Sequence, residues 1–433
     1  GDGGSFSYTP TAVARHAAAS LTATAADMVE EFTVTVGDGH GGSVVVAVSV
    51  AITPDNATPT GSSSSGAPDV TSGVVAGSVL GIDSDGDPLS YSAPGSTGKG
   101  AIVLSADGAF TYTPTVLARH AASLATATVD DTTDSFTVTI SDGYGGTIDI
   151  PVSVTISPAA VTFNFVYGSG SGYWTADARS ALEAAVASLS SYIVVEAPVS
   201  LTYDVIGQNS ATSGLLATAY APFSSSSVGY TGTVAQTKII TGVDANGSAS
   251  DGSITWNFAY PWATGDRVGN RQYDFQAVAL HEMLHTLGFL TGIESPTSMD
   301  RNWTIYDSFL ATSDGTAAIG GDYVWNSAYT TNLTGGNGGL YFDGPNAVAA
   351  YGGLVPLYTP STWASGSSVA HLDPNNPPVG TYIMDPADGF GPGARVIGAV
   401  ELGILQDLGY TVTPSQLSVF VIVGLGLMRR RRE

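Results

Sequence analysis

The 433-residue chain contains no cysteine, only two lysines and few charged residues, and each shortage excludes something. Without cysteine, disulfides are excluded. Lys99 and Lys238 are the two lysines, and the formal net charge is −24, so binding to nucleic acid through its phosphates is not expected. Charged residues make up 12% and hydrophobic residues 43%, with 54 glycines, which is typical of folded, loop-rich β modules. Solubility alone can explain the excess of acidic residues, and binding of calcium is the alternative, functional explanation.

The N-terminal part of the chain holds two copies of one repeat. Residues 4–54 recur as residues 108–158, a spacing of 104 residues (108 − 4). This is the size of one β-sandwich of Ig or cadherin type, and residues 136–140 alternate apolar and polar side chains as a half-buried strand does. The first copy lacks the counterpart of residues 69–104, so we expect further sequence upstream. The repeats resemble the cadherin-like modules of large bacterial surface proteins.

A turn in the second repeat carries three carboxylates on alternate positions. Asp83, Asp85 and Asp87 stand in the segment IDSDGDP. Calcium prefers several oxygen ligands in such a flexible loop. Two interpretations remain open, a calcium site or a polar turn that opens a strand, since the twelve-residue EF-hand pattern is absent. His16 and His120 recur at one place in the two repeats, and we expect a structural role for them rather than metal binding.

Beyond residue 160 the chain has three histidines, and two of them share one motif. His281-Glu282-Met-Leu-His285 is an H-E-x-x-H pattern that continues as H-E-x-x-H-x-x-G-F through Gly288. On a helix predicted over 274–287, the two histidines lie one turn apart and can reach one metal. Zinc lowers the pKa of a bound water, and Glu282 can remove its proton as it attacks a carbonyl. Gly288 can take the left-handed conformation that ends a helix.

A catalytic zinc site needs a third protein ligand. The remaining histidine, His371 in GSSVAH, is the candidate, and a carboxylate such as Asp307 is the alternative. The segment YIMDP follows and predicts a methionine turn around Met384. A structural loop histidine and ordinary core packing are the other interpretations of His371 and Met384.

These motifs resemble the leishmanolysin branch of the metzincin peptidases. The resemblance covers roughly residues 160–412 and is carried by HEMLHTLGF, GSSVAH and YIMDP. It implies three zinc ligands, His281, His285 and His371. It also implies Glu282 as catalytic base and Met384 as the floor beneath the metal. The absence of cysteine and the long insertion between the ligands indicate a bacterial relative with its own substrate specificity.

The patterns together predict a multidomain chain, with N-terminal all-β sandwich repeats (Ig/cadherin-like) before an α+β zincin catalytic domain. Its predicted parts are a truncated cadherin-like repeat (1–54), a linker (55–68), a second repeat (69–158), a metzincin-like peptidase domain (160–412) with an insertion between ligands (292–370), and a C-terminal tail (413–433). In the peptidase domain we expect strands at 161–167, 201–206 and 254–258, and helices at 175–189 and 394–408. By analogy with zincins, the strand at 254–257 is expected to line the cleft and pair with an extended peptide.

The C-terminal tail holds an apolar run, Leu417 to Met428, followed by four arginines. Twelve residues span about 18 Å as a helix, less than the roughly 30 Å hydrocarbon core of a bilayer. The layout resembles sorting signals that exosortase-like enzymes process in Gram-negative bacteria, although the Pro-Glu-Pro motif is absent. We therefore expect export to the cell surface or the medium by a Gram-negative bacterium, with attachment to the cell envelope through the tail. A simple membrane-associated tail is the alternative.

The predicted function is that of a secreted or surface zinc metalloendopeptidase. It would hydrolyse a protein or peptide substrate through a zinc-activated water, with Glu282 as general base. The alternative is a surface adhesin or matrix protein whose peptidase-like domain is catalytically silent. Glu282 argues against this, since a domain that only binds has no need of a general base. Hydrolysis of a non-peptide amide is a third hypothesis.

Overall fold

The chain divides into two compact units, Gly1–Pro158 and Ala159–Glu433. The computed structural model describes residues 4–297, 299–375, 382–387 and 389–413. The predicted sorting signal at 413–433 lies outside these described residues except for Thr413. Within the described ranges, no helix combines the length and the apolar character that crossing a bilayer requires.

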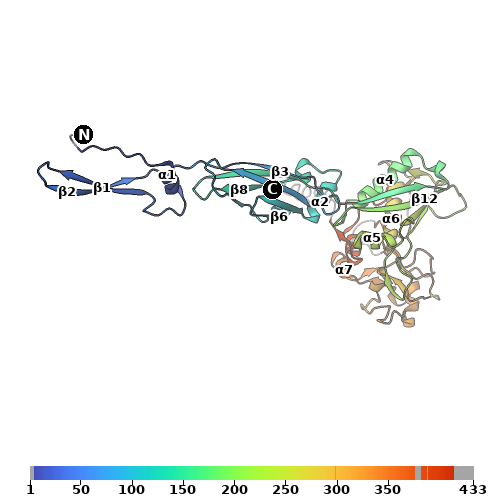
Figure 1. Ribbon diagram of the computed structural model, residues 1–433. Helices are drawn as coiled ribbons and strands as arrows, with labels where there is room; N and C mark the ends of the chain where they lie inside the picture. Colours follow the sequence, from blue (N-terminus) through green and yellow to red (C-terminus); the bar gives the residue numbers. More distant parts are fainter. Residues whose placement is uncertain (1–3, 298, 376–381, 388, 414–433) are drawn as a thin grey trace, which may run out of the picture. The chain divides into compact units, whose positions relative to one another are not determined.

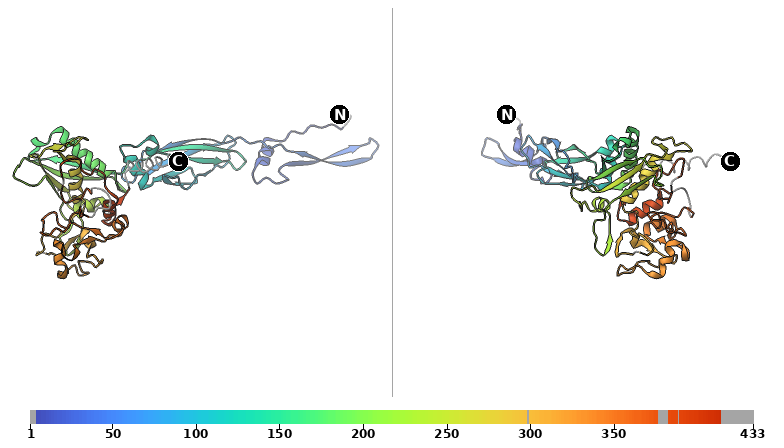
Figure 2. Two further views of the ribbon diagram at one scale, coloured as in Figure 1. Left: turned by 180° about the vertical axis from the view of Figure 1, so that it is seen from behind. Right: turned by 90° about the vertical axis from the view of Figure 1, so that its right-hand side faces the viewer.

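The first repeat copy forms one helix and a two-stranded hairpin. Helix α1 (Ala12–Ala19) is capped by the side chain of Thr11. Strands β1 (Val29–Gly37) and β2 (Ser43–Ala51) pair antiparallel over their whole length (Figure 1), and Figure 2 shows the same hairpin from behind. A hairpin alone has no second layer to cover its apolar side chains, so valines of both strands stay exposed. Where a truncated β-sandwich was predicted for residues 1–54, the described residues hold this helix and hairpin.

The second copy forms two packed antiparallel sheets, as its length predicts, but its first strand, β3 (Thr60–Ser65), lies in the segment 55–68 that was predicted as a linker, so that prediction is wrong. One sheet has the order β3-β4-β7-β6 and the other the order β5-β8-β9. Buried side chains alternate along β8, where Phe136, Val138 and Ile140 face the core. The ring of Phe136 meets that of Phe110 from the opposite sheet edge to face, with centroids 5.3 Å apart. The elements are β3 (Thr60–Ser65), β4 (Val75–Ile82), β5 (Ser90–Ser92), β6 (Gly100–Leu104), β7 (Ala109–Pro114), α2 (Val116–Ser123), α3 (Val129–Thr132), β8 (Thr133–Ser141) and β9 (Thr147–Thr155).

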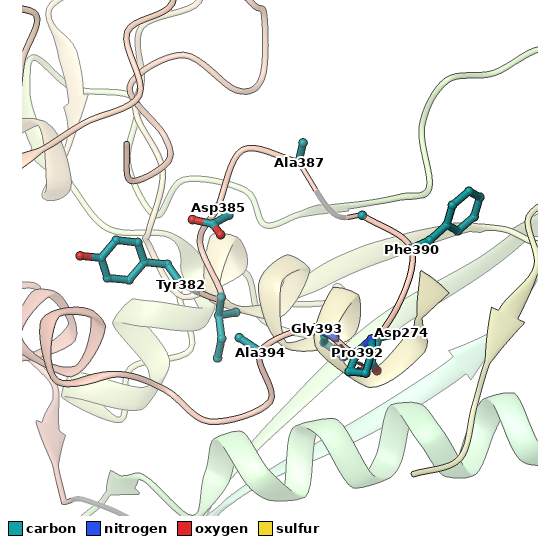
Figure 3. A pocket seen from close by; sticks show the side chains of 11 residues that line it. Asp274, Tyr382, Asp385, Ala387, Phe390, Pro392, Gly393 and Ala394 are labelled. Atoms are coloured by element: carbon teal, nitrogen blue, oxygen red, sulfur yellow. Dashed lines mark hydrogen bonds between the residues drawn. The ribbon is translucent and has the colours of Figure 1, made fainter. Parts of the chain in front are cut away.

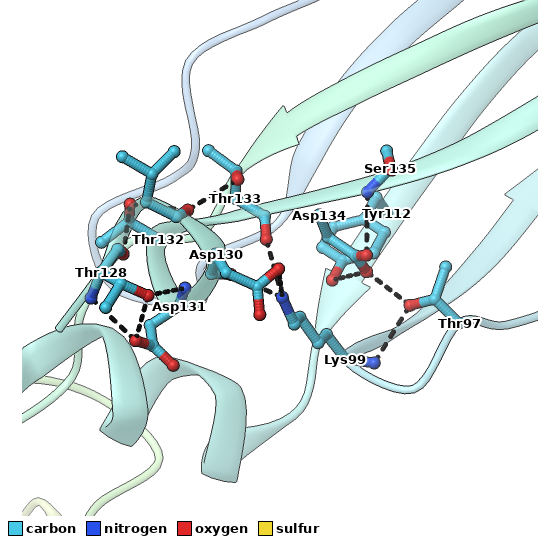
Figure 4. Close-up of polar contacts among 11 residues, drawn as sticks. Thr97, Lys99, Tyr112, Thr128, Asp130, Asp131, Thr132, Thr133, Asp134 and Ser135 are labelled. Atoms are coloured by element: carbon cyan, nitrogen blue, oxygen red, sulfur yellow. Dashed lines mark hydrogen bonds and ion pairs between the residues drawn. The ribbon is translucent and has the colours of Figure 1, made fainter.

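A polar network ties α3 to the strands around it (Figure 4). Thr128 and Asp131 form a capping box at the start of this helix. Lys99, just before β6, forms an ion pair of 3.1 Å with Asp130. The hydroxyl of Tyr112 donates to Asp134 at 2.7 Å. One of the two lysines of the chain is thus used to hold the sandwich together.

The second unit is built around a four-stranded sheet of order β10-β12-β15-β13. Strands β10 (Val161–Tyr167), β12 (Val199–Gln208) and β15 (Gly252–Asn257) are parallel, and β13 (Ala217–Tyr220) pairs antiparallel at one edge. The predicted strands at 161–167, 201–206 and 254–258 are therefore confirmed to within a few residues.

Helices α4 (Ala176–Ser190) and α6 (Phe275–Thr286) pack against each other, and both contact the sheet (Figure 1). The side chain of Thr175 caps α4, and that of Asp274 caps α6 by accepting two backbone N–H groups. The apolar face predicted for α4 is buried. Helix α6 is buried almost all round, which holds the histidines it carries in fixed positions.

The segment predicted as an insertion, 292–370, folds onto the same core. It contains helix α7 (Pro345–Tyr351) and a three-stranded antiparallel sheet of β19 (Leu310–Ala311), β20 (Tyr341–Phe342) and β21 (Val355–Pro356), in that order. Helix α7 packs closely on α8 (Ala399–Asp407), where a Cβ atom on Gly403 would lie 2.7 Å from the Cα of Ala347. Helix α8 starts five residues later than predicted, because the chain turns into the helix only at Gly398, where Glu401 caps it.

The remaining elements of this unit are short. They are η1 (Ser171–Tyr173), β11 (Ile193–Val194), β14 (Gly229–Thr231), α5 (Val234–Thr241), β16 (Trp262–Ala263), β17 (Tyr273–Asp274), β18 (Asn302–Thr304), η2 (Tyr306–Phe309), η3 (Ser327–Thr334), η4 (Gly336–Gly338) and β22 (Thr411–Val412).

Candidate metal centre

Three histidine side chains from distant parts of the second unit converge on one point. His281 and His285 lie one turn apart on α6, and their Nε2 atoms are 3.2 Å apart. His371 comes from the loop after β21, and its Nε2 lies 3.1 Å from that of His281. Tetrahedral zinc with Zn–N bonds of about 2.05 Å places two ligand nitrogens about 3.3 Å apart. The spacing of the three imidazoles therefore fits one zinc ion.

Each imidazole is oriented by a hydrogen bond from its other nitrogen. The Nδ1 atoms of His281, His285 and His371 lie 2.7, 2.7 and 2.8 Å from the backbone carbonyl oxygens of Ile383, Phe289 and Ser367. A carbonyl oxygen can only accept, so each Nδ1 carries the proton and each Nε2 presents its lone pair to the common point. Three lone pairs this close repel one another unless a cation lies between them.

Burial keeps the imidazoles of His285 and His371 neutral. Desolvation, followed by the neighbouring imidazoles, lowers the pKa of His371 to about 3, and the same two causes hold the pKa of His285 well below its ordinary value. A neutral imidazole is the form that binds a metal. At neutral pH no proton competes for the two Nε2 lone pairs.

The end of α6 sets the orientation of His285. The last helical residue is Thr286, and Gly288 follows with φ of +97°, a left-handed conformation that a side chain would strain. A Cβ atom at Gly288 would also lie 2.5 Å from Oε1 of Gln236. This turn brings the carbonyl of Phe289 back to His285, so Gly288 acts as the helix-ending residue that the sequence predicts.

The predicted methionine turn lies against the histidines through its backbone. The carbonyl of Ile383 accepts from His281, and the carbonyl of Met384 accepts from the N–H of Leu372, next to His371, at 3.0 Å. The side chain of Met384 is fully buried. The turn thus connects the helix and the loop that carry the three histidines.

Glu282 faces the same cavity as the histidines. This cavity has a volume of about 620 Å³, and His281, Glu282, His285 and His371 line it together. Its lining also includes residues 214–221, 365–368 and 370. A glutamate therefore lines the same cavity as the three imidazoles, in a space large enough for a bound segment of substrate.

The edge strand of the sheet along this cavity is β13, not β15. We predicted that the strand at 254–257 would pair with a peptide, and that prediction is wrong. Strand β15 is bonded to β12 on one side and to β13 on the other, so both its edges are occupied. Residues 217–220 of β13 line the cavity and have β15 on one side. Strand order could not be read from the sequence, which led to the wrong assignment.

Asp307, the alternative third ligand, has a different place. Its carboxylate accepts hydrogen bonds from the Thr291 hydroxyl at 2.6 Å, from Gly292 N–H at 2.8 Å and from Thr304 N–H at 2.9 Å. Burial raises the pKa of this carboxyl. Asp307 ties the loop after α6 together, whereas the ligand atoms that converge in this part of the described chain belong to His281, His285 and His371.

The segment after the methionine turn reaches back to the start of α6 (Figure 3). Asp274 pairs with the guanidinium of Arg395 at 2.8 Å and accepts from Gly393 N–H at 3.2 Å. The ring of Phe390 packs on Tyr273 with centroids 4.5 Å apart. A cavity of about 100 Å³ remains under this segment, with Asp274 and Asp385 on its walls. The segment therefore links the methionine turn to the helix that carries the motif.

A second group of potential ligands lies in the first unit. The predicted calcium turn brings Asp85 and Asp87 together with His16, and their ligand atoms all lie within 4.8 Å of one another. The Nε2 of His16 is 2.9 Å from Asp87, and its ring stacks on Tyr144 with centroids 4.2 Å apart. The hydrogen bond to Asp87 is the main cause that raises the pKa of His16.

Sequence analysis gave His16 a structural role and did not foresee that its ring lies beside Asp85 and Asp87. Its counterpart His120 is buried in α2. The two histidines occupy the same position in the repeats, so the sequence did not show that their surroundings differ. The third acidic residue, Asp83, uses one oxygen to accept the N–H groups of Asp85 and Gly86 at 2.8 and 3.1 Å.

Comparison with known proteins bears on the N-terminal region. Residues 55–155 match the family described as "Bacterial Ig domain". No curated protein matches the chain. Among solved structures, the extracellular cadherin domains 1–5 of protocadherin gamma B2 share 14% identity, with a TM-score of 0.17 over 33% of this chain and 29% of that chain. An endo-fucoidan hydrolase from glycoside hydrolase family 107 shares 17% identity, with a TM-score of 0.14 over 33% and 23%.

This chain thus spans less than a third of the length of either solved structure, and TM-scores this low carry no argument about activity. The family match supports the β-sandwich part of the sequence prediction. The chain is multidomain, and its second repeat is a bacterial Ig-like domain, of a type consistent with a surface or extracellular protein.

Proposed function

We propose that the second unit is a zinc metalloendopeptidase domain. The observation that carries the proposal is the set of three imidazoles, two of them buried, whose Nδ1 atoms are held by backbone carbonyls and whose Nε2 atoms converge. Resemblance of the motifs to metzincins points the same way. A silent adhesin domain has no use for such an arrangement beside a carboxylate in an open cavity.

Zinc bound by His281, His285 and His371 would supply a Lewis acid that lowers the pKa of water and polarises a carbonyl. The residues of the chain would transfer the proton and bind the substrate. Glu282 would take a proton from the attacking water and return it to the departing amine. Strand β13 would bind an extended substrate along its free edge through backbone hydrogen bonds. We favour cleavage within a polypeptide, because the cleft of the peptidase class that the motifs resemble is open at both ends.

Proteolysis by the purified chain should depend on its metal. With an unfolded casein-type substrate, we expect cleavage that a strong chelator abolishes and that zinc restores. Magnesium added back at the same concentration serves as the control, because Mg²⁺ prefers oxygen ligands in octahedral geometry. Proteolysis that survives complete metal removal would contradict the proposal, and a zinc-loaded chain with no activity on any polypeptide would favour the adhesin.

For the first unit we propose a calcium site at the turn 82–87. The observation that favours it is a set of buried carboxylate and amide oxygens, Asp83 Oδ2, Asp87 Oδ2 and Asn56 Oδ1, that have no hydrogen-bond partner among the described residues. Asp85 adjoins them, since it accepts from the N–H of Ala57 at 2.8 Å. The side chain of Asp87 is only 8% exposed. Unpaired buried oxygens are costly, and a hard cation with oxygen ligands removes that cost.

Calcium should stabilise the full chain through these oxygens. At a calcium concentration 100 times the dissociation constant, stabilisation is expected to be about 2.7 kcal/mol. Asp87→Asn should lose most of it, whereas Asp107→Asn, a change in an exposed turn of the same sandwich, should keep it. Calcium titration followed by thermal unfolding measures the effect. Equal responses of both variants, or no response of the wild type, would show that the turn is only polar.

We also propose that the chain acts outside the cell, at the surface of a Gram-negative bacterium. The bacterial Ig-like domain supports an extracellular location. The resemblance of the C-terminal tail to a sorting signal supports attachment to the envelope. Fractionation of expressing cells, with and without residues 414–433, tests the role of the tail.

A further inference from the structure

We propose that Glu401 is a positioning residue that holds the methionine turn in the shape that fixes two zinc ligands. The proposal rests on the proposed function. Glu401 lies in the first turn of α8 and is 1% exposed. It is distant in sequence from every ligand and belongs to none of the motifs that the sequence analysis singled out.

The two oxygens of Glu401 serve two different parts of the chain. Oε2 accepts from the N–H of Gly398 at 2.8 Å, which caps α8. Oε1 accepts from the N–H of Met384 at 2.9 Å, which reaches into the methionine turn. One carboxylate thus fixes the turn to the start of a buried helix.

The turn passes this constraint on to the histidines. While its N–H group at Met384 points to Glu401, its carbonyl at Ile383 accepts from Nδ1 of His281 at 2.7 Å. Its carbonyl at Met384 accepts from Leu372, the residue after His371, at 3.0 Å. Loss of a group that orients metal ligands through hydrogen bonds typically changes metal affinity or activity by 10–100-fold.

A helix cap alone does not account for this arrangement. A glutamate can cap a helix at the surface, where its charge stays hydrated, but this one is buried together with the turn. Burial raises the pKa of Glu401 to about 7, so the fold retains a carboxyl group at a site that disfavours its charge. A carboxyl group that the fold retains despite the cost of its burial is consistent with a role for both of its oxygens.

The test compares two changes on α8 that remove similar hydrogen bonds. In Glu401→Gln the amide nitrogen cannot accept, so either Met384 or Gly398 loses its acceptor. The matched control is Asp407→Asn, since Asp407 accepts from the N–H groups of Asn346 and Ala347, both at 2.9 Å, and caps α7 away from the turn. Both variants are measured for zinc affinity, for kcat and KM, and for the visible spectrum of the cobalt-substituted protein.

We expect Glu401→Gln to weaken zinc binding by roughly 10–100-fold, to lower kcat more than it raises KM, and to shift the cobalt spectrum. Asp407→Asn should leave zinc affinity and the cobalt spectrum unchanged. If Glu401→Gln does not fold, Glu401→Asp replaces it. This variant keeps a carboxylate that is one methylene too short to reach both partners, and it should show the same changes in milder form. Zinc affinity and cobalt spectra equal to those of the wild type, or to those of Asp407→Asn, would overturn the proposal.

The outcome is separable from that of the proposed function. If the wild type holds zinc but cleaves no polypeptide, the peptidase proposal fails while the affinity and spectrum still test Glu401. If the wild type binds no transition metal, both proposals fail together.

Discussion

Replacing Glu282 with glutamine is expected to lower kcat/KM for peptide hydrolysis by about 10²–10⁴-fold while one zinc per chain stays bound. Glutamine has the size of glutamate and keeps one oxygen, but it cannot take a proton from water at neutral pH. Glu282 follows the first ligand on α6 and lines the same cavity as all three histidines. The metal position should not change, because Glu282 is not one of the converging ligands.

Glu183→Gln is the matched control, because Glu183 is an exposed glutamate on α4. It should retain full activity and full zinc content. Unchanged proteolysis in the Glu282 variant would show that another group acts as the base. Loss of zinc together with activity would show instead that this side chain holds the site together.

Replacing His371 with alanine is expected to remove stoichiometric zinc and to bring proteolysis below detection. The change leaves two imidazoles, and the loss of a direct ligand should cost more than the roughly 100-fold that loss of an orienting group can cost. His40→Ala, in the exposed loop of the first hairpin, is the control and should keep one zinc per chain. Metal analysis after gel filtration distinguishes the two. If His371→Ala retains equimolar zinc, the remote ligand is not His371.

The part of the site that is local in sequence could be predicted, because helix geometry alone brings its residues together. His281, Glu282 and His285 need only the 3.6-residue period of α6 and a helix end at Gly288. His371 was the candidate because it was the one histidine left in that region and because the motifs resemble a known family. No local pattern shows that the loop after β21 contacts α6, although His371 and His281 are 90 residues apart in the sequence.

What could not be predicted depends on tertiary neighbours. The cleft strand was assigned to residues 254–257 because they precede the motif, whereas the edge position of β13 follows from strand order. His16 meets Asp87 across 71 residues, and Glu401 meets Met384 across 17 residues that include a loop. In both cases the sequence shows a common residue type in an ordinary helix, and only the packing reveals its partner.

Zinc K-edge X-ray absorption on the purified chain tests the central claim most directly, since it reports both metal content and ligand type. The account predicts one zinc per chain, with three imidazole nitrogens at about 2.0–2.1 Å and one further light ligand. A chain that holds no stoichiometric zinc, or one whose metal is surrounded by oxygen ligands alone, would contradict it.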